Sequence, residues 1–425
     1  TNYAPLIITF IAATWFLIAL YAIIPQFSPR GESVYIGRYP QTPLAMLAGL
    51  FIPAKIEYVL KLFASVGFLA LFDPITVLIG APSLVLNLLS AYDAQYSGTY
   101  HYSAPVAPYF VLAAIGGAQK IRNSQFAIRN LKAGLIASAF LVALGYHLVA
   151  GYTPIGGEYF LPEYTLHHKD LARFIRQIPP AAKVSTTASL FPHLSHRPVL
   201  YRFPTIRDAE YILLDVSQSH ITNPIDYREN YLRALDLGFG IRDALDGYIL
   251  LQRGVAQKEL PEGFYTFLRE CNCTAPQNRV LIDFGDKVRF LGYDVRQDDW
   301  QRVYLRTYWA RLPGLNNNFA LYPFFPDENG APRADAQLPP LLVHFWYPTL
   351  RWQPDEAIIA DTTPLELGDR AKIGLGVFFG ASWDDPEFIL PPRTDAPIPL
   401  NGDWAMIGEL VRDGKKYRAV APSQK

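Results

Sequence analysis

A tyrosine-rich loop, residues 91–105, holds the side chains best suited to chemistry. A carboxylate and an imidazole in this loop offer a general base or a partner for an anion. Tyrosine is also favoured at a membrane surface, because its ring is apolar and its hydroxyl stays hydrated, so a purely interfacial role remains an alternative. The candidate catalytic residues are Asp93, His101 and Tyr102, and the candidate substrate-binding residues of this loop are Gln95 and Tyr100.

A second polar segment, Pro192–Pro198, contains His193, His196 and Arg197, which are further candidates for substrate binding. Two histidines at this spacing hold a metal only with additional ligands, which the spacing does not supply, so no metal site is predicted. The alternative is a buried turn that these residues hydrogen-bond, with Arg197 paired to a carboxylate. No phosphate-loop, nucleophile-elbow or H-E-x-x-H motif occurs in the sequence, and no cofactor is predicted.

Five apolar stretches before residue 153 are typical of transmembrane helices, which need roughly 17–25 mostly apolar residues. Between the second and third, Asp73-Pro74 predicts a tight helical hairpin, because proline removes a donor and disfavours helix at the preceding residue. Leu44–Pro53 is apolar but short, which predicts an interfacial or re-entrant segment. The five stretches are Pro5–Pro25, Glu57–Phe72, Ile75–Ser90, Ala104–Ala118 and Ala133–Tyr152.

The basic segment Gln119–Lys132 sets the predicted orientation, because it has four Lys or Arg residues and no acidic residue. Such a loop lies in the cytoplasm. A multi-pass protein of the cytoplasmic membrane is therefore predicted, with Gln26–Pro53, Ala91–Ser103 and everything after about residue 152 outside the cytoplasm. The chain begins at Thr1 and not at Met, and we expect further helices upstream in a longer protein.

The pattern changes to α/β after a linker that contains Gly and Pro. Tyr211–Val216 is a nearly continuous apolar run, typical of a strand buried on both faces, and Asp246-Gly247 is a hairpin signal. Later strands separated by Pro and Asn-Gly turns indicate a β-sandwich or jelly roll. The predicted fold class is a multi-domain membrane protein: an α-helical transmembrane bundle (1–152), a small α/β domain (153–256) and a jelly-roll-like β-sandwich domain (257–425).

Composition limits the partners and the metal chemistry. The formal net charge is zero, so no strong field attracts nucleic acid, and no nucleic-acid partner is predicted. Cys271 and Cys273 are the only cysteines; a lone C-x-C does not complete a zinc site, which leaves inert thiols or a disulfide. Six of the seven Trp residues lie between Trp300 and Trp404. Exposed in a row they would stack on sugar rings, and buried they would be structural.

Three motifs together resemble an uncharacterised bacterial family of predicted multi-pass membrane proteins: Pro82–Ser90, His101–Pro105 and Pro192–Pro198. The resemblance covers roughly residues 1–255. In layout the family is similar to the GT-C class of membrane glycosyltransferases, which take sugars from polyprenyl-phosphate carriers. The resemblance implies a lipid-linked sugar donor at the outer face of the membrane and a base that deprotonates an acceptor hydroxyl.

One departure from the GT-C pattern concerns the acidic catalytic residue. Those enzymes carry an acidic residue in the first outward loop, and neither Glu32 nor Asp93 matches that position. The residues therefore leave a second hypothesis open. In it the chain is a non-enzymatic accessory or structural subunit of a larger membrane complex, whose external domains bind a protein partner or carbohydrate.

Overall fold

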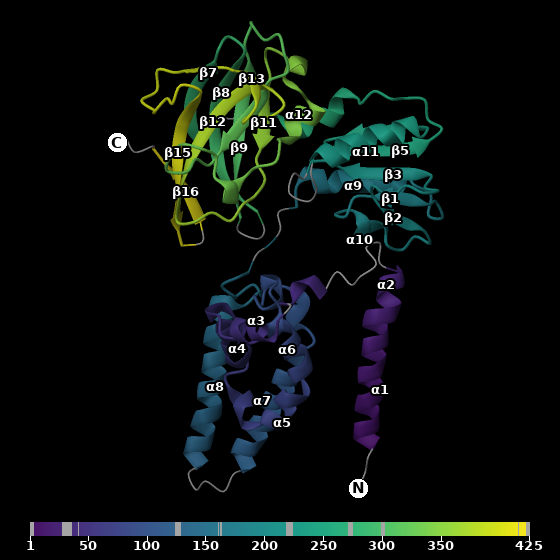
Figure 1. Cartoon of the computed structure of the whole chain (residues 1–425), viewed down its shortest axis with the longest axis vertical. Coiled ribbons are helices and arrows are strands. Elements are labelled where there is room, and N and C mark those ends of the chain that lie inside the picture. The colour runs from purple at the N-terminus through teal and green to yellow at the C-terminus, as the bar shows by residue number, and fades with distance from the viewer. Residues whose placement is uncertain are drawn as a thin grey trace. The chain divides into compact units, whose positions relative to one another are not determined.

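The chain divides into two compact units, Thr1–Leu161 and Pro162–Lys425. The first is helical and the second carries the strands (Figure 1), which confirms the predicted order of helices followed by a strand-rich region. Four residues named in the sequence analysis lie outside the described residues: Glu32, Cys271, Cys273 and Trp300. The computed structural model describes residues 4–27, 36–40, 42–123, 129–159, 161, 164–217, 224–270, 275–298, 302–414 and 416–421.

The N-terminal helix is continuous from Ala4 to Phe27 and carries no charged residue. It consists of α1 (Ala4–Ile18), a π-helical turn (Ala19–Ile23) and α2 (Ile24–Phe27). The π turn adjoins Pro25, whose missing N–H interrupts the regular α-helical ladder. Its window Phe10–Phe27 is long and apolar enough to cross a membrane.

A second helix of sufficient length and hydropathy is α8 (Arg129–Ala150), in its window Lys132–Ala150. Within the described residues these are the two helices that meet this test. Two of the five predicted crossings therefore have the expected length, and the other three are shorter or broken. The shorter helices are α3 (Pro43–Gly49), α4 (Pro53–Ala64), α5 (Pro74–Ile79), α6 (Ala81–Leu89) and α7 (Ala107–Asn123).

The stretch predicted as one helix from Glu57 to Phe72 is interrupted, because Gly67 and Phe68 have positive φ angles of 61° and 60°. A right-handed helix does not continue through left-handed residues. A short 3₁₀ turn, Leu69–Phe72, follows. The chain then breaks at Asp73-Pro74, as predicted, and α5 begins at the proline.

Helix α7 approaches this break closely. A Cβ atom on Gly117 would lie 2.1 Å from the Leu69 carbonyl oxygen, so only glycine fits there. Lys120 of the same helix forms an ion pair with Asp73, at 2.7 Å. Small residues and one ion pair thus hold α7 against the Asp73-Pro74 turn.

The second unit begins with a five-stranded sheet in the order β2-β1-β3-β5-β4. The first three strands are parallel and the last two form an antiparallel hairpin. Its turn is Asp246-Gly247, as predicted, and both residues have positive φ. The strands are β1 (Val184–Thr186), β2 (Leu200–Arg202), β3 (Tyr211–Asp215), β4 (Phe239–Leu245) and β5 (Tyr248–Arg253).

Helices α9 (Leu166–Arg176) and α11 (Pro224–Asp236) cover opposite faces of this sheet. Side chains alternate between faces along β3. Leu213 packs in a cluster with Phe174 of α9, and Ile212 packs in a cluster with Tyr231 of α11. Both faces of β3 are therefore covered, which accounts for its continuous apolar sequence.

Two antiparallel sheets follow, in the orders β14-β7-β8-β9-β11-β6 and β10-β12-β15-β16, with β13 beside β12. One hydrophobic cluster includes residues of both sheets and of α11, so it crosses the predicted boundary at residue 256. The finer jelly-roll topology stays a prediction. The elements are β6 (Arg269–Glu270), β7 (Asn278–Phe284), β8 (Val288–Gln297), β9 (Val303–Arg311), β10 (Ala320–Phe324), α12 (Leu342–Trp346), β11 (Ala357–Asp361), β12 (Arg370–Gly380), β13 (Pro386–Ile389), β14 (Pro392–Arg393), β15 (Trp404–Asp413) and β16 (Lys416–Val420).

The tryptophans of this region are mostly core residues. Trp309, Trp346, Trp352 and Trp404 are buried, and Trp383 is half-buried. The sequence analysis predicted stacking on sugars only for a row of exposed tryptophans. No such row is found on this region among the described residues.

Candidate functional site

Polar and aromatic side chains from four separate segments converge in the helical unit. They come from residues 36–40, the first two turns of α4, the end of α6 and the tyrosine-rich loop that follows α6. We call this group the tyrosine cluster, and its members are Arg38, Lys55, Tyr58, Asn87, Tyr92, Tyr96, Tyr102 and Ser103.

Arg38 joins its segment to the tyrosine-rich loop. Its guanidinium donates to the Tyr102 hydroxyl at 3.0 Å and lies 4.3 Å from the centroid of the Tyr92 ring. The Arg38 carbonyl accepts from the Ala91 N–H at 2.7 Å. The cation is therefore held in place by a hydrogen bond and an aromatic face.

Asn87, near the end of α6, is buried, and its side-chain amide donates two hydrogen bonds. Its side-chain amide donates to the Tyr58 hydroxyl at 3.1 Å and to the Tyr102 carbonyl at 3.0 Å. The Tyr58 hydroxyl also contacts the Ser103 hydroxyl at 3.2 Å. A buried network of this kind holds its members in one arrangement when its hydrogen bonds are satisfied.

Lys55 lies in the first turn of α4, after the N-terminal Pro53, and is only 3 % exposed. Its ammonium is 4.9 Å from the centroid of the Tyr96 ring. No carboxylate of the described residues lies within ion-pair distance of it. A buried charge without a counterion is costly, so this position favours the arrival of an anionic group.

The predicted residues of the loop occupy different environments. Tyr102 belongs to the tyrosine cluster, and His101 is exposed and stacks on its ring at 4.4 Å. Asp93 is exposed, and its carboxylate accepts from the Ala94 N–H at 2.8 Å. Gln95 is buried and accepts a hydrogen bond from Ser90, whereas Tyr100 is 47 % exposed.

Arg38 and Lys55 were not among the sequence-predicted site residues. A signal for Lys55 was present, because it is a basic residue between the apolar stretches Leu44–Pro53 and Glu57–Phe72. A charge inside a membrane segment indicates a functional site, whereas a lysine at the end of a segment commonly extends to the membrane interface. The placement of Arg38 depends on contacts with residues more than fifty positions away, which no local pattern reveals.

His193, His196 and Arg197 belong to the second unit, in and just after the short helix α10 (Phe191–Leu194). Both histidines are exposed. Arg197 is buried, and its guanidinium donates to the carbonyls of Ile178, at 2.9 Å, and Pro179. The alternative in which Arg197 pairs with a carboxylate is therefore wrong. Its partners are main-chain carbonyls just beyond the end of α9.

A further group of polar side chains surrounds His167, which is followed directly by His168. Its Nδ1 lies 2.9 Å from Asp246, and its Nε2 lies 3.3 Å from Asp215 and 3.2 Å from the Ser217 hydroxyl. Burial alone lowers the pKa of His167, but the hydrogen bonds to Asp215 and Asp246 outweigh it and raise that pKa to about 9. His167 belongs to α9, Asp215 ends β3 and Asp246 lies in the turn between β4 and β5, so these contacts tie α9 to the sheet.

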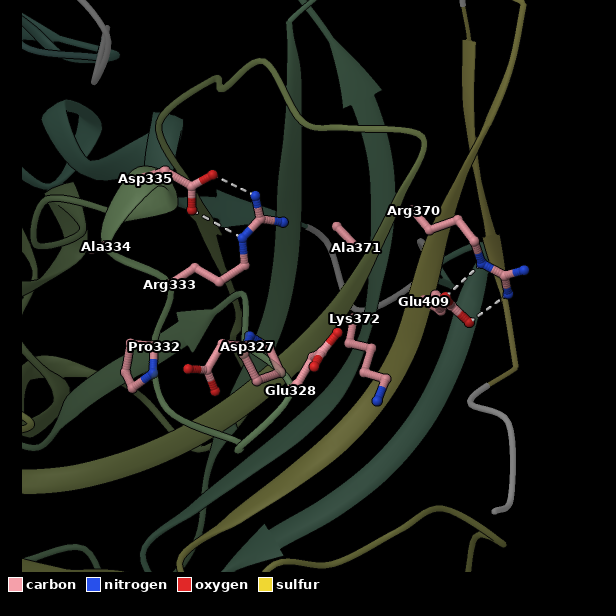
Figure 2. Close-up of a pocket in the computed structure, with 11 residues that line it drawn as sticks. Asp327, Glu328, Pro332, Arg333, Ala334, Asp335, Arg370, Ala371, Lys372 and Glu409 are labelled. Atoms are coloured by element: carbon pink, nitrogen blue, oxygen red, sulfur yellow. Dashed lines mark hydrogen bonds and ion pairs between the residues drawn. The ribbon is translucent and has the colours of Figure 1, made fainter.

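A cavity of about 740 Å³ on the β-rich region is lined mainly by charged side chains (Figure 2). Two of its cations are already paired in a bidentate manner, Arg333 with Asp335 and Arg370 with Glu409. Such pairs are part of a solvated surface and leave little charge for a ligand. Among the described residues, no group of three or more His, Cys, Asp or Glu side chains is arranged to hold a metal ion.

Two described helices of the helical unit are long and apolar enough to cross a membrane. The comparison with protein families agrees. The model of a predicted membrane protein family, DUF2079, matches residues 2–250, more than half of the chain, and the chain belongs to this family. No curated protein and no solved structure matches the chain.

Proposed function

We propose that this protein is a GT-C-like membrane glycosyltransferase, or the C-terminal part of one, that uses a polyprenyl-phosphate-linked sugar. The donor would be used at the outer face of the cytoplasmic membrane, with the residues after about 152 outside. The observation that carries the proposal is Lys55, a buried cation of the tyrosine cluster that has no carboxylate partner among the described residues. A carrier phosphate would supply the missing counter-charge.

The tyrosine cluster supports this chemistry through its links. Arg38 and Asn87 both bind Tyr102, one at its hydroxyl and the other at its carbonyl. A cation and an amide are therefore held on the loop that also carries Asp93 and His101. Phosphate oxygens are good acceptors for guanidinium N–H groups, and aromatic rings suit the interface where a lipid-linked sugar resides. Asn87 donates its two N–H groups to Tyr58 and Tyr102, so its part is to position Tyr102.

The proposed reaction is an inverting transfer. The acceptor hydroxyl attacks the anomeric carbon of the donor, a new C–O bond forms, and the bond from that carbon to the carrier phosphate oxygen breaks. The hydroxyl proton passes to a base, for which Asp93 and His101 are the candidates in this chain. The phosphate leaves with the electron pair, and Lys55 stabilises its charge.

The test is binding of polyprenyl phosphate to the purified chain in lipid nanodiscs. We expect Lys55→Met to weaken binding about tenfold or more, because a charge-assisted contact is lost. Lys61→Met is the matched control, since Lys61 lies on the same helix but is 39 % exposed and paired with Glu57 at 2.7 Å. Equal binding by wild type and Lys55→Met would contradict the proposal.

A further inference from the structure

A cavity of about 540 Å³ lies in the β-rich region, beside β10, the end of β12 and the segment that leads into α12. Its volume is in the range of pockets that bind small ligands, about 300–1,000 Å³. It shares no lining residue with the charged cavity of Figure 2. The transferase proposal and the three sequence motifs do not account for it.

The cavity contains an aromatic platform. The rings of Tyr322 and Trp383 are nearly parallel, at 14°, with centroids 5.0 Å apart. Phe378 meets each of them edge-on, at 84° and 76°. A Cβ atom on Gly376 would lie 2.4 Å from the Trp383 ring, so this glycine lets the indole lie flat against β12.

Trp383 differs from the other tryptophans described in this region, because it is half-buried and lines a cavity. The others are buried in the core. A flat apolar face that remains accessible is suited to the C–H face of a sugar ring. Tyr322 and Trp383 both keep part of their surface exposed and both line the cavity.

Polar groups beside the platform are neutral and oriented. His344 accepts from the Leu321 N–H at its Nε2, at 2.9 Å. Loss of hydration lowers the pKa of His344 to about 4. The ring is therefore neutral at pH 7, and its proton is on Nδ1, which is a donor. Asn318 accepts from the Leu350 N–H at 3.1 Å through its side-chain oxygen, which orients its NH₂ donors.

The near absence of charged side chains from the cavity lining favours a neutral ligand. Of the described lining residues, Asp384 is the one charged side chain, and no Lys or Arg is present. Anionic ligands such as phosphates and uronic acid polymers need cations, and this cavity would repel them. Neutral sugars need an apolar face, donors and acceptors, which the cavity offers.

We infer that this cavity binds a neutral glycan, with a pyranose ring stacked on the Tyr322–Trp383 platform and its hydroxyls bonded to the neutral polar groups around it. The inference does not depend on the transferase proposal. If both hold, the β-rich region retains the glycan that the helical unit extends.

The test uses the full chain in detergent and isothermal titration calorimetry with three hexasaccharides: cellohexaose and maltohexaose, which are neutral, and the anionic hexamer of galacturonic acid. We expect at least one neutral hexasaccharide to bind and the anionic one to bind more weakly. Trp383→Ala should weaken binding about tenfold or more. The affinity of Trp383→Phe should lie between those of wild type and Trp383→Ala, because phenylalanine retains a smaller ring and preserves the fold.

Tyr164→Ala is the control, because Tyr164 is an exposed aromatic residue of the same unit that does not line the cavity. Its affinity should equal that of wild type. No binding of either neutral sugar, tighter binding of the anionic one, or unchanged affinity in both Trp383 variants would overturn the inference. Lys55→Met should bind the glycan as wild type does. A failure of the glycan-binding inference is therefore distinguishable from a failure of the transferase proposal.

Discussion

The ammonium of Lys55 lies 4.9 Å from the centroid of the Tyr96 ring, and both residues are buried. A desolvated cation–π contact contributes about 2 kcal/mol, whereas burial of an ion costs several kcal/mol. The aromatic ring therefore offsets only part of the cost of burying the charge. The remainder would be recovered when an anionic group binds, which is the physical basis of the proposed carrier site.

Lys55→Met should leave the stability of the chain unchanged or raise it. Methionine has a similar length and no charge, and replacing a buried charge with an apolar side chain is often neutral or stabilising. The measurement is the midpoint of thermal unfolding in nanodiscs, with Lys61→Met as the exposed control. A large fall in the midpoint for Lys55→Met alone would indicate a structural role for the ammonium.

Gly117→Ala should destabilise the helical unit. The new methyl would lie 2.1 Å from the Leu69 carbonyl oxygen, so α7 must move away from the 3₁₀ turn and from Asp73. Gly134→Ala is the matched change, because nothing lies within 4 Å of its Cβ position on α8. That change should be neutral or stabilising by about 1 kcal/mol. Equal unfolding midpoints for the two variants would contradict the close approach of α7.

His167 should make the second unit more stable in acid than in base. Its pKa in the folded chain is about 9, above the unfolded value of 6.5. The stabilisation is therefore fully present below about pH 6.5 and is lost as the pH rises through about 9, a change on the order of 3 kcal/mol. The measurement is the unfolding midpoint from about pH 6 to 10 in wild type and His167→Gln.

The variant should lack this component of the pH dependence, because glutamine does not titrate. His193→Gln is the control, since His193 is exposed, and it should behave as wild type. Identical pH profiles for wild type and His167→Gln would show that the ion pairs with Asp215 and Asp246 do not stabilise the fold.

Arg197→Met should lower stability and leave carrier binding unchanged. The guanidinium satisfies the carbonyls of Ile178 and Pro179, and each buried carbonyl left without a partner costs about 1–3 kcal/mol. Arg202→Met, at an exposed position of β2, is the control for loss of one positive charge. A stable Arg197→Met protein with impaired carrier binding would instead support the substrate-binding role anticipated from its motif.

Local patterns predicted the α/β sheet well. The hairpin predicted at Asp246-Gly247 joins β4 and β5, and the predicted apolar run Tyr211–Val216 contains β3, because apolar runs and a two-residue turn are local signals. No strand was predicted at β7, β15 or β16. All three mix charged and apolar residues and are stabilised by pairing with neighbouring strands, which local patterns describe poorly.

Hydropathy predicted the apolar stretches of the helical unit but not all of their breaks. The break at Pro74 was predicted, whereas the break at Gly80, between α5 and α6, and the left-handed pair Gly67-Phe68 both fall in stretches that were predicted as continuous helix. An apolar composition does not reveal backbone conformation. Likewise, the loop that contains Asp93 and His101 was found from its residue types, but its partners Arg38 and Lys55 are joined to it by long-range contacts.

The most direct measurement of the central claim is sugar transfer by the chain reconstituted in liposomes. Polyprenyl phosphates carrying radiolabelled glucose, mannose or N-acetylglucosamine would be donors, added soluble oligosaccharides and water would supply the acceptor hydroxyl, and label leaving the lipid phase would be counted. We expect wild type and Lys61→Met to release labelled sugar from at least one donor. The rate of release with Lys55→Met should be lower by about tenfold or more. No release from any donor, together with a stoichiometric protein partner that copurifies, would contradict it and favour an accessory subunit.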